Sequence, residues 1–434
     1  MSNPDLRNIG ELYKSGRFDD VVAQARPYLR RNQDCAQGWN FLALAYRMLG
    51  DTDKSEYLFT QLISKNPLNI AFKTNLANLY LNQGKTSRSI DLYREVLDIF
   101  PRDVNSLNGL GLGYVHLNNL AQAKIQYEKI LRIAPDNHEG RYQLANIQRK
   151  YGDYAHAAEL FKGLSDLKSR VHRLDCLYYA RDIDQFTGEC IKLVAEGQRS
   201  PLLGCLIQHA NSEHGLGISN PFCDASMEYV LHEDLAELGL LTQNLKDKIL
   251  EHHARARDYS GQPLLSNGKQ TSGNIFNYPD QFLKELYQAL QQFVERYRVN
   301  FKGSGQGFLD HFPKDYRLYG WLVDIESGGH LKPHIHKEGW LSAAFYLKVP
   351  KVKGTEAGIE FSYHGADYPV KQRKHPSMIK NIREGEICMF PSSLFHRTKP
   401  FSGEGARISF AFDVIPRDLS DFHQKTERPR EKVD

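Results

Sequence analysis

The chain has 434 residues, which at roughly 100–200 residues per domain indicates two or three domains with more than one buried core. Apolar residues make up 41% and charged residues 25%, so the composition is that of an ordinary globular protein and excludes a disordered or fibrous chain. The net charge of +4 is too small to favour nucleic acid or a membrane surface as a partner, and we expect neither.

The N-terminus and the cysteines both indicate a cytoplasmic protein. No basic segment followed by an apolar run opens the sequence, and no stretch approaches the ~20 apolar residues of a membrane span. The six cysteines are spread singly, without a Cys-x-x-Cys pair that would indicate zinc or redox chemistry. We therefore expect reduced, mostly buried cysteines.

A 34-residue spacing of turn residues runs through the first part of the chain. Its positions are Gly16, Gly50, Gly84, Asn118 and Gly152. Glycine and asparagine most readily take the left-handed conformation that ends a helix. From the second turn onward an aromatic residue stands nine positions after each turn, and a proline follows seventeen positions after three of them. Each repeat is therefore predicted to hold two helices and then a proline stop.

This pattern resembles the tetratricopeptide repeat. The second unit carries the family's characteristic positions at Trp39, Leu42, Ala43, Tyr46, Gly50, Phe59 and Pro67. The resemblance covers residues 1–170 and implies an α-solenoid in which the aromatic residues pack one helix pair on the next. Its concave face would hold a peptide or another protein; the alternative is a purely structural or dimerising role.

The hydrophobic pattern divides the region after the repeats into several segments. Residues 171–199 continue the helical pattern without the repeat signature and are predicted to form a helical cap. Residues 200–225 hold several Pro and Gly residues and are predicted to be a linker. Helical spacing returns in Leu241–Arg257 and Pro279–Tyr297, which are predicted to cover a sheet. Residues 417–434 are almost wholly polar and are expected to be a frayed tail.

Residues 226–416 are predicted to form the second domain, and within it the hydrophobic period changes to two from about Tyr316. The predicted strands are Arg317–Glu326, Leu341–Val349, Gly358–Tyr363, Met378–Ile382, Glu386–Pro391 and Ala406–Ile415. Many short strands without intervening helices predict a sandwich, jelly roll or barrel. The fold class is thus multidomain α plus β.

Three histidines of this region are candidate metal ligands. Because residues i and i+2 of an extended chain share a face, the imidazoles of His334 and His336 converge. His396 follows Pro391 in a strand, turn and strand that could return it to the same pocket. In a jelly roll this is metal-ligand geometry; the alternative is that these are surface histidines.

Arg407 and Ser409 are candidate anion-binding residues. They share one strand face in the segment that follows His396. Arginine offers a fixed fork of donors that binds a carboxylate in two places, and a serine hydroxyl adds a third bond. The alternative is an arginine on a solvated strand face.

The region of about residues 220–416 resembles the 2-oxoglutarate- and Fe(II)-dependent oxygenase superfamily. The motif that carries the resemblance is Pro333-His334-Ile-His336-Lys-Glu-Gly-Trp340-Leu-Ser342-Ala-Ala-Phe-Tyr346-Leu. It implies a double-stranded β-helix, or jelly roll, that binds Fe(II) and 2-oxoglutarate. His396 would be the distal iron ligand, and Arg407 and Ser409 would clamp the distal carboxylate of 2-oxoglutarate. Tyr346 would also touch 2-oxoglutarate, or else is a core aromatic.

The sequence departs from the family pattern in the proximal motif. The family binds iron with His-x-Asp/Glu and a distal His, whereas the residue two positions after His334 is His336; Glu338 fits only if His336 comes first. We favour His334, His336 and His396 as the metal ligands, with Glu338 as the alternative carboxylate ligand. No catalytic residue is predicted beyond the metal ligands.

The resemblance implies a dioxygenase that uses O2 and 2-oxoglutarate, with a peptide or protein side chain as the leading substrate. Two alternatives stay open. A cupin-like metal enzyme without 2-oxoglutarate is suggested because Pro391-Ser-Ser-Leu-Phe-His396 partly imitates a cupin motif. A non-catalytic repeat scaffold with a degenerate barrel is suggested by the imperfect iron motif.

Overall fold

The computed structural model describes residues 4–235, 242–255, 259–260, 263–371 and 375–417. The chain forms two compact units, Met1–Ser165 and Asp166–Asp434, and each is described by itself. Apart from Arg417, the predicted polar tail lies outside the described residues. Within the described part of the chain, no helix combines the length and the apolar character that crossing a membrane requires.

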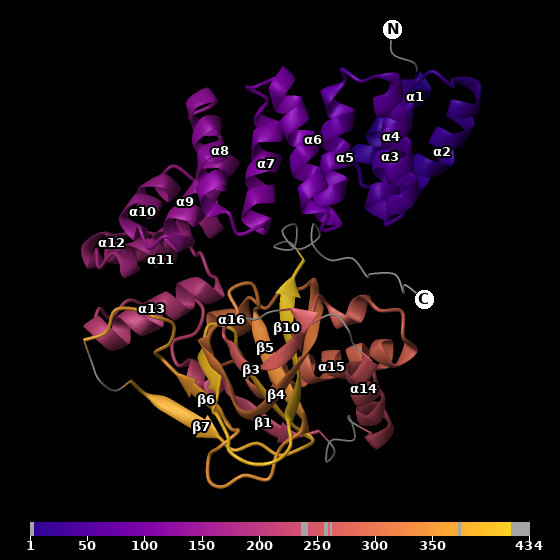
Figure 1. Cartoon of the computed structure of the whole chain (residues 1–434). Helices are drawn as coiled ribbons and strands as arrows, with labels where there is room; N and C mark the ends of the chain where they lie inside the picture. The colour runs from indigo at the N-terminus through magenta and orange to yellow at the C-terminus, as the bar shows by residue number, and fades with distance from the viewer. Residues whose placement is uncertain (1–3, 236–241, 256–258, 261–262, 372–374, 418–434) are drawn as a thin grey trace. The chain divides into compact units, whose positions relative to one another are not determined.

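The first unit is a stack of helices that pack on one another in chain order, running from indigo to magenta in Figure 1. They are α1 (Pro4–Lys14), α2 (Phe18–Arg31), α3 (Ala36–Leu49), α4 (Thr52–Lys65), α5 (Ile70–Asn82), α6 (Thr86–Ile99), α7 (Val104–His116), α8 (Leu120–Ile133), α9 (His138–Lys150) and α10 (Tyr154–Lys162). This is the predicted solenoid of helix pairs.

The residues at the 34-residue spacing lie at turns that end helices, as the sequence predicts. All five turn residues have positive φ, at 74°, 91°, 74°, 55° and 78° in chain order. The aromatic residues nine positions later, Phe59, Tyr93, Tyr127 and Phe161, are fully buried between helices. The packing role expected of them is confirmed.

Helix starts in this unit follow the same spacing. Asp103 and Asn137 stand 34 residues apart, and the side chain of each accepts a hydrogen bond from the backbone N–H three residues on. Asn119 and Asp153, also 34 apart, cap α8 and α10 in the same way. Such caps satisfy backbone donors that a helix leaves open at its first turn.

The second unit begins with three helices, α11 (Leu167–Tyr179), α12 (Ile183–Ala195) and α13 (Pro201–His214). Helix α13 occupies more than half of the segment predicted to be a linker, so that interpretation is wrong for residues 201–214. Pro201 stands at the start of the helix behind the cap Ser200, and Gly215 ends it with φ of 64°. Proline at the first turn and glycine just past the end are helix boundaries rather than breaks.

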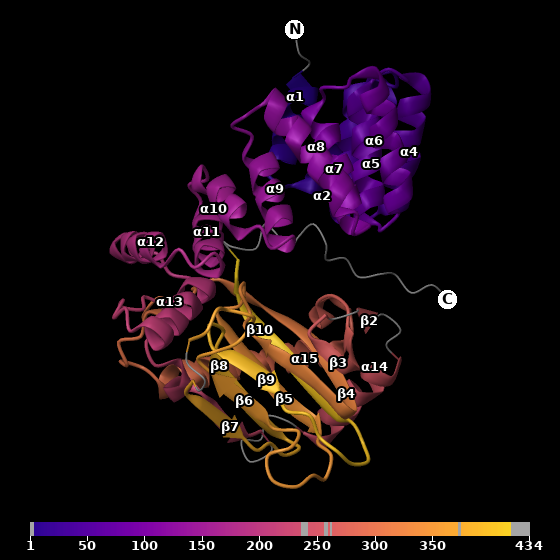
Figure 2. The ribbon, with the colours of Figure 1, turned by 60° about the vertical axis from the view of Figure 1, so that its left-hand side comes forward.

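The rest of this unit is a curled antiparallel sheet of ten strands among the described residues (Figure 2). The strand order is β1-β8-β5-β10-β4-β9-β6-β7, and β3 joins β2 to β4. The strands are β1 (Leu231–Asp234), β2 (Tyr259–Ser260), β3 (Leu265–Thr271), β4 (Tyr316–His334), β5 (Leu341–Lys348), β6 (Ile359–Ser362), β7 (Ser377–Lys380), β8 (Glu386–Pro391), β9 (Phe395–Thr398) and β10 (Arg407–Pro416). The sheet is compatible with a jelly roll.

All six predicted strands are present, and four further strands are not among them. The first three, β1 to β3, precede the region where the period of two begins, and β9 is the return strand that carries His396. The β3 segment, Leu-Ser-Asn-Gly-Lys-Gln-Thr, is mostly polar, so it has no apolar alternation to mark it.

Three helices and two short turns complete the described part of the unit. They are α14 (Gln243–Arg255), α15 (Gln281–Asn300), α16 (Gly307–Asp310) and the 3-10 turns Ser226–Tyr229 and Ile275–Asn277. The apolar face of α15, with Leu286, Leu290 and Phe293, shares one core with Phe410 and Phe412 of β10. The prediction that these helices cover the sheet is confirmed for the described residues; positions 241, 256 and 257 lie outside them.

Candidate active site

Strand β4 bends between its two halves and thereby serves two parts of the sheet. Its first half pairs with β10 from Tyr316 to Ile325, and its second half pairs with β9. The bend falls near Gly328, which has φ of 77°. As a result His334 at the end of β4 lies directly opposite His396 in β9.

His334, His336 and His396 form one cluster. One ring nitrogen of each lies within 4.8 Å of a ring nitrogen of each of the other two. The Nε2 atoms of His334 and His336 are 3.2 Å apart. Nitrogen ligands of a tetrahedral metal with bonds of about 2.0–2.1 Å are themselves about 3.3–3.4 Å apart. The cluster therefore has the size of a metal site.

The hydrogen bonds of the other ring nitrogens fix the tautomers. His334 Nδ1 donates to the carbonyl of Lys332 at 2.8 Å, and His396 Nδ1 donates to the carbonyl of Leu394 at 3.2 Å. Since a carbonyl only accepts, each Nδ1 carries the proton and each Nε2 of the neutral ring keeps its lone pair. Both Nε2 atoms are thus available to a cation.

Burial favours the neutral, metal-binding form of these rings. Burial lowers the pKa of His334 to about 3, and repulsion from the neighbouring His336 is the second-largest cause. Burial also holds the pKa of His396 well below its usual range, followed by the effects of His334 and His336. Near neutral pH neither of the two rings carries a charge that would repel a cation.

Asp413 orients the third histidine and is a residue that sequence reasoning missed. Its Oδ1 lies 2.6 Å from Nδ1 of His336 and also accepts from the hydroxyl of Ser342 at 2.7 Å. The backbone approaches this pair closely at Gly339, where a Cβ would lie 3.0 Å from Cγ of Asp413. A carboxylate behind a ligating imidazole fixes its orientation and raises its basicity.

A signal for Asp413 is present in the sequence. Arg407, Ser409, Ala411 and Asp413 alternate along β10 with Ile408, Phe410, Phe412 and Val414. The apolar set joins the core against α15, and the other set lines a cavity. A carboxylate on the same strand face as Arg407 and Ser409 could therefore have been placed with them.

Arg407 is a buried cation whose hydrogen bonds among the described residues go to a carbonyl and a hydroxyl and not to a carboxylate. Its side chain is held by Nε donating to the carbonyl of Ala357 at 3.0 Å and Nη1 to the hydroxyl of Ser409 at 3.4 Å. The guanidinium carbon lies 4.9 Å from the ring centroid of Tyr346. Burial lowers the pKa of Arg407, which expresses the cost of an enclosed charge that an anionic ligand would offset.

The histidines and the arginine line one cavity of about 430 Å³. Arg407 and Ser409 therefore reach the same space as the three imidazoles, as their pattern in the sequence predicts. Trp321 also lines this space, with its ring 5.5 Å from that of His336. A cation site and an anion site within one cavity can hold a small dicarboxylate that touches both.

The remaining residues of the predicted site differ in placement. Glu338 is exposed at the edge of the cavity and is not part of the three-histidine cluster. Tyr346 is fully buried, and among the described residues its hydroxyl makes no hydrogen bond. Trp340 packs in the core against α15 and donates from Nε1 to the carbonyl of Phe308 at 2.7 Å, so its role is structural.

Both the repeat region and the sheet region match known protein families. Residues 319–413 match the family described as "Putative 2OG-Fe(II) oxygenase", a range that contains the histidine cluster, Arg407 and Asp413. Residues 11–70 and 74–138 match the tetratricopeptide repeat family.

Individual relatives resemble parts of the chain. The Protein CTR9 homolog of Arabidopsis thaliana is 24% identical over 263 residues, 56% of this chain and 23% of that protein. The general transcriptional corepressor trfA of Dictyostelium discoideum is 21% identical over 31% of this chain and 10% of its own length. This chain thus spans less than a quarter of either relative.

Among solved structures, a tetratricopeptide repeat protein from Parabacteroides merdae is 19% identical, with a TM-score of 0.39 over 48% of this chain and 84% of its own. A tetratricopeptide repeat protein of Thermus thermophilus is 22% identical, with a TM-score of 0.35 over 40% of this chain and 97% of its own. By the family models, residues 11–70 and 74–138 are tetratricopeptide repeats, and residues 319–413 match the family "Putative 2OG-Fe(II) oxygenase".

Proposed function

We propose that the second unit is an Fe(II)- and 2-oxoglutarate-dependent dioxygenase that hydroxylates a peptide or protein side chain recruited through the repeats. The observation that carries the proposal is the juxtaposition of three histidines with a buried arginine in one cavity. The curled sheet would be the double-stranded β-helix that the resemblance implies.

The donor set fits Fe(II). His334, His336 and His396 would hold the ion, and imidazole is a ligand that suits iron. Fe(II) sites of this kind commonly include one carboxylate ligand, which this cluster lacks. Asp413 contributes a negative charge one step away, through its hydrogen bond to His336. When bound, iron would supply the activation of O2, which protein side chains cannot.

The anion site fits the far carboxylate of 2-oxoglutarate. The guanidinium of Arg407 and the hydroxyl of Ser409 would donate to this carboxylate. The buried hydroxyl of Tyr346, whose ring lies beside Arg407, makes no hydrogen bond among the described residues and would be a further donor. These residues would bind and orient the co-substrate.

The overall reaction balances without any other reactant. One 2-oxoglutarate, one O2 and one substrate C–H give succinate, CO2 and a substrate C–OH. One oxygen atom enters the new carboxylate of succinate and the other the new hydroxyl group. The two electrons that the substrate C–H loses and the two from decarboxylation together reduce O2.

The repeats offer a site of suitable chemistry for a peptide. A cavity of about 520 Å³ on the first unit is lined by Arg26, Arg30, Lys54, Trp39 and Tyr57, among other residues. Tyr57 is 64% exposed, which leaves its ring available to a partner. Basic and aromatic groups together favour an acidic segment with apolar side chains.

The test is succinate formation by full-length protein loaded with Fe(II) and supplied with 2-oxoglutarate and O2, with and without candidate peptides. We expect iron-dependent succinate release that Arg407→Gln abolishes. Iron binding without any 2-oxoglutarate binding would contradict the proposal and favour the cupin-like alternative. A folded protein that binds neither would favour the scaffold.

A further inference from the structure

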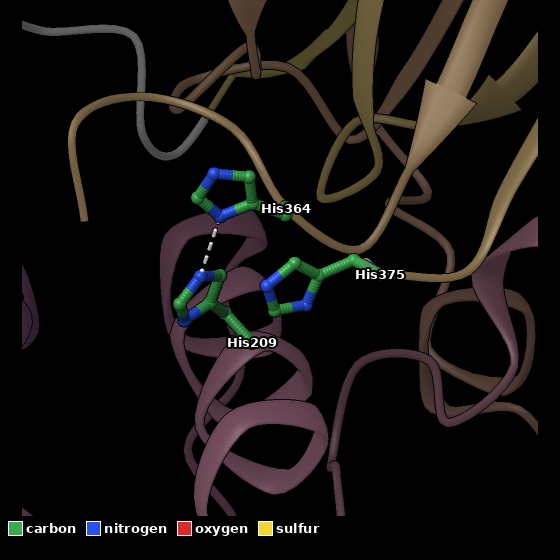
Figure 3. Close-up of side chains that lie close together, drawn as sticks. All are labelled: His209, His364 and His375. Carbon is green, nitrogen blue, oxygen red and sulfur yellow. Dashed lines mark hydrogen bonds between the residues drawn. The ribbon is translucent and has the colours of Figure 1, made fainter. Parts of the chain in front are cut away.

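We propose that His209, His364 and His375 form a second, structural metal site that binds zinc. This site is separate from the iron site and does not depend on the proposed oxygenase activity. His209 lies on α13, and the other two lie on the connection between β6 and β7 (Figure 3). All three belong to the second unit.

The distances suit a single small cation. One ring nitrogen of each histidine lies within 4.8 Å of one ring nitrogen of each of the others. His209 Nε2 and His364 Nδ1 are 2.9 Å apart. The ligand nitrogens of tetrahedral zinc are about 3.3–3.4 Å apart, given Zn–N bonds of about 2.0–2.1 Å. The rings of His364 and His375 are stacked, with centroids 4.6 Å apart, so binding a cation would require their side chains to rotate.

A buried nitrogen of His375 faces the carboxylate of Glu213. Nε2 of His375 makes no hydrogen bond among the described residues; it lies 3.4 Å from Oε2 of Glu213, and only 5% of the His375 side chain is exposed. Figure 3 shows a ring nitrogen of His375 directed toward the other two imidazoles. A buried nitrogen without a hydrogen bond carries a free-energy penalty, which a cation bound beside the Glu213 carboxylate would remove.

Buried polar groups surround the three histidines. Nδ1 of the fully buried His209 is 2.7 Å from the hydroxyl of Tyr178, and when Nδ1 donates, Nε2 keeps its lone pair for the cation. The carboxylate of Glu213 has no exposed side-chain surface and lies 3.4 Å from Nε2 of His375. A buried negative charge at this position offsets the charge of a divalent ion.

The site would fasten helices to the sheet. His209 and His364 are 155 residues apart in the chain, so an ion between them closes a long loop. The same β6–β7 connection is already tied to α11 by Tyr368, whose hydroxyl donates to Asp175 at 2.7 Å. Imidazole is a ligand that suits zinc, and an ion that joins a helix to a loop in this way would have a structural role.

The experiment removes the first cluster so that bound zinc reports only on the second. Full-length His334→Ala/His396→Ala protein is stripped with a chelator, dialysed against zinc and analysed for metal content. We expect one zinc per chain. Adding His364→Ala should weaken zinc binding at least 100-fold, whereas His214→Ala, on the same helix but outside the cluster, should leave it unchanged. A folded background protein that holds no zinc would overturn the proposal.

A second measurement covers the case in which that background protein does not fold. Wild-type protein should then bind two zinc ions per chain, and His364→Gln or His375→Gln should bind one, with circular dichroism confirming that each variant is folded. Zinc should raise the melting temperature of the wild type by a larger amount than that of His364→Gln. Equal zinc content in the wild type and both variants would refute the second site.

Discussion

The second unit contains two clusters of three histidines that differ in their surroundings. His334 and His396 turn their Nδ1 atoms to backbone carbonyls, and their cluster opens onto a cavity that also holds Arg407. His209 is instead fully buried against the hydroxyl of Tyr178, and its cluster joins a helix to a loop. Three imidazoles thus suit a catalytic metal in the first cluster and a structural metal in the second.

The orienting groups differ in charge as well. Behind the first cluster stands the carboxylate of Asp413, hydrogen-bonded to His336. Behind the second stands a neutral phenol, since burial raises the pKa of Tyr178. A carboxylate strengthens an imidazole ligand more than a hydroxyl does. Variants of these groups can therefore separate the two sites.

The largest effect is expected from His396→Ala. Loss of one of three ligands should abolish Fe(II) binding and lower succinate formation at least ~1000-fold, because iron supplies the O2 chemistry. Zinc content at the second cluster should not change. Metal analysis and a succinate assay check both expectations; turnover that survives would remove His396 from the iron site.

Arg407→Gln should raise the Kd for 2-oxoglutarate about 100-fold, because it removes charge-assisted bonds to a buried carboxylate worth a few kcal/mol. Iron binding should persist. The matched control is Arg397→Gln, since Arg397 is 45% exposed and paired with Glu360. Anaerobic calorimetry measures both affinities, and equal losses in the two variants would contradict a specific clamp.

Asp413→Asn should weaken metal binding at the first cluster about 10- to 100-fold, the usual effect of losing an orienting carboxylate. The amide keeps the shape of the side chain but not its charge. Binding at the second cluster is the internal reference. If Fe(II) affinity is unchanged in a competition titration with a chelator, Asp413 has no part in holding the ion.

Tyr178→Phe should have the smallest effect. It removes the hydroxyl beside His209 Nδ1 without removing the ring, and we expect zinc affinity at the second cluster to fall by about 10-fold or less. Fe(II) and 2-oxoglutarate binding should stay at wild-type values. A larger loss at the first cluster than at the second would reverse the assignment of this tyrosine.

Local patterns made much of the fold predictable. The 34-residue spacing predicts the turns because a left-handed residue such as Gly50 or Asn118 is needed wherever two helices meet. Proline and glycine led to a wrong prediction at residues 201–214. There Pro201 and Gly215 bound a helix instead of interrupting one, and their positions alone do not distinguish these cases.

The candidate sites divide along similar lines. His334 and His336 lie two residues apart on one strand, so their convergence follows from strand geometry. His209 and His364 are brought together only by the packing of α13 on a distant loop, and no spacing in the sequence indicates this. Asp413 is an intermediate case. The alternation along its strand predicts which face it lies on, but nothing in the sequence predicts its hydrogen bond to His336.

The most direct test of the central claim is a crystal structure of full-length protein grown anaerobically with Fe(II) and 2-oxoglutarate, with anomalous scattering recorded at the iron edge. We expect an iron peak bonded to His334, His336 and His396, and a carboxylate of 2-oxoglutarate against Arg407. Iron bound through Glu338 instead of His334, or 2-oxoglutarate away from Arg407, would contradict the account.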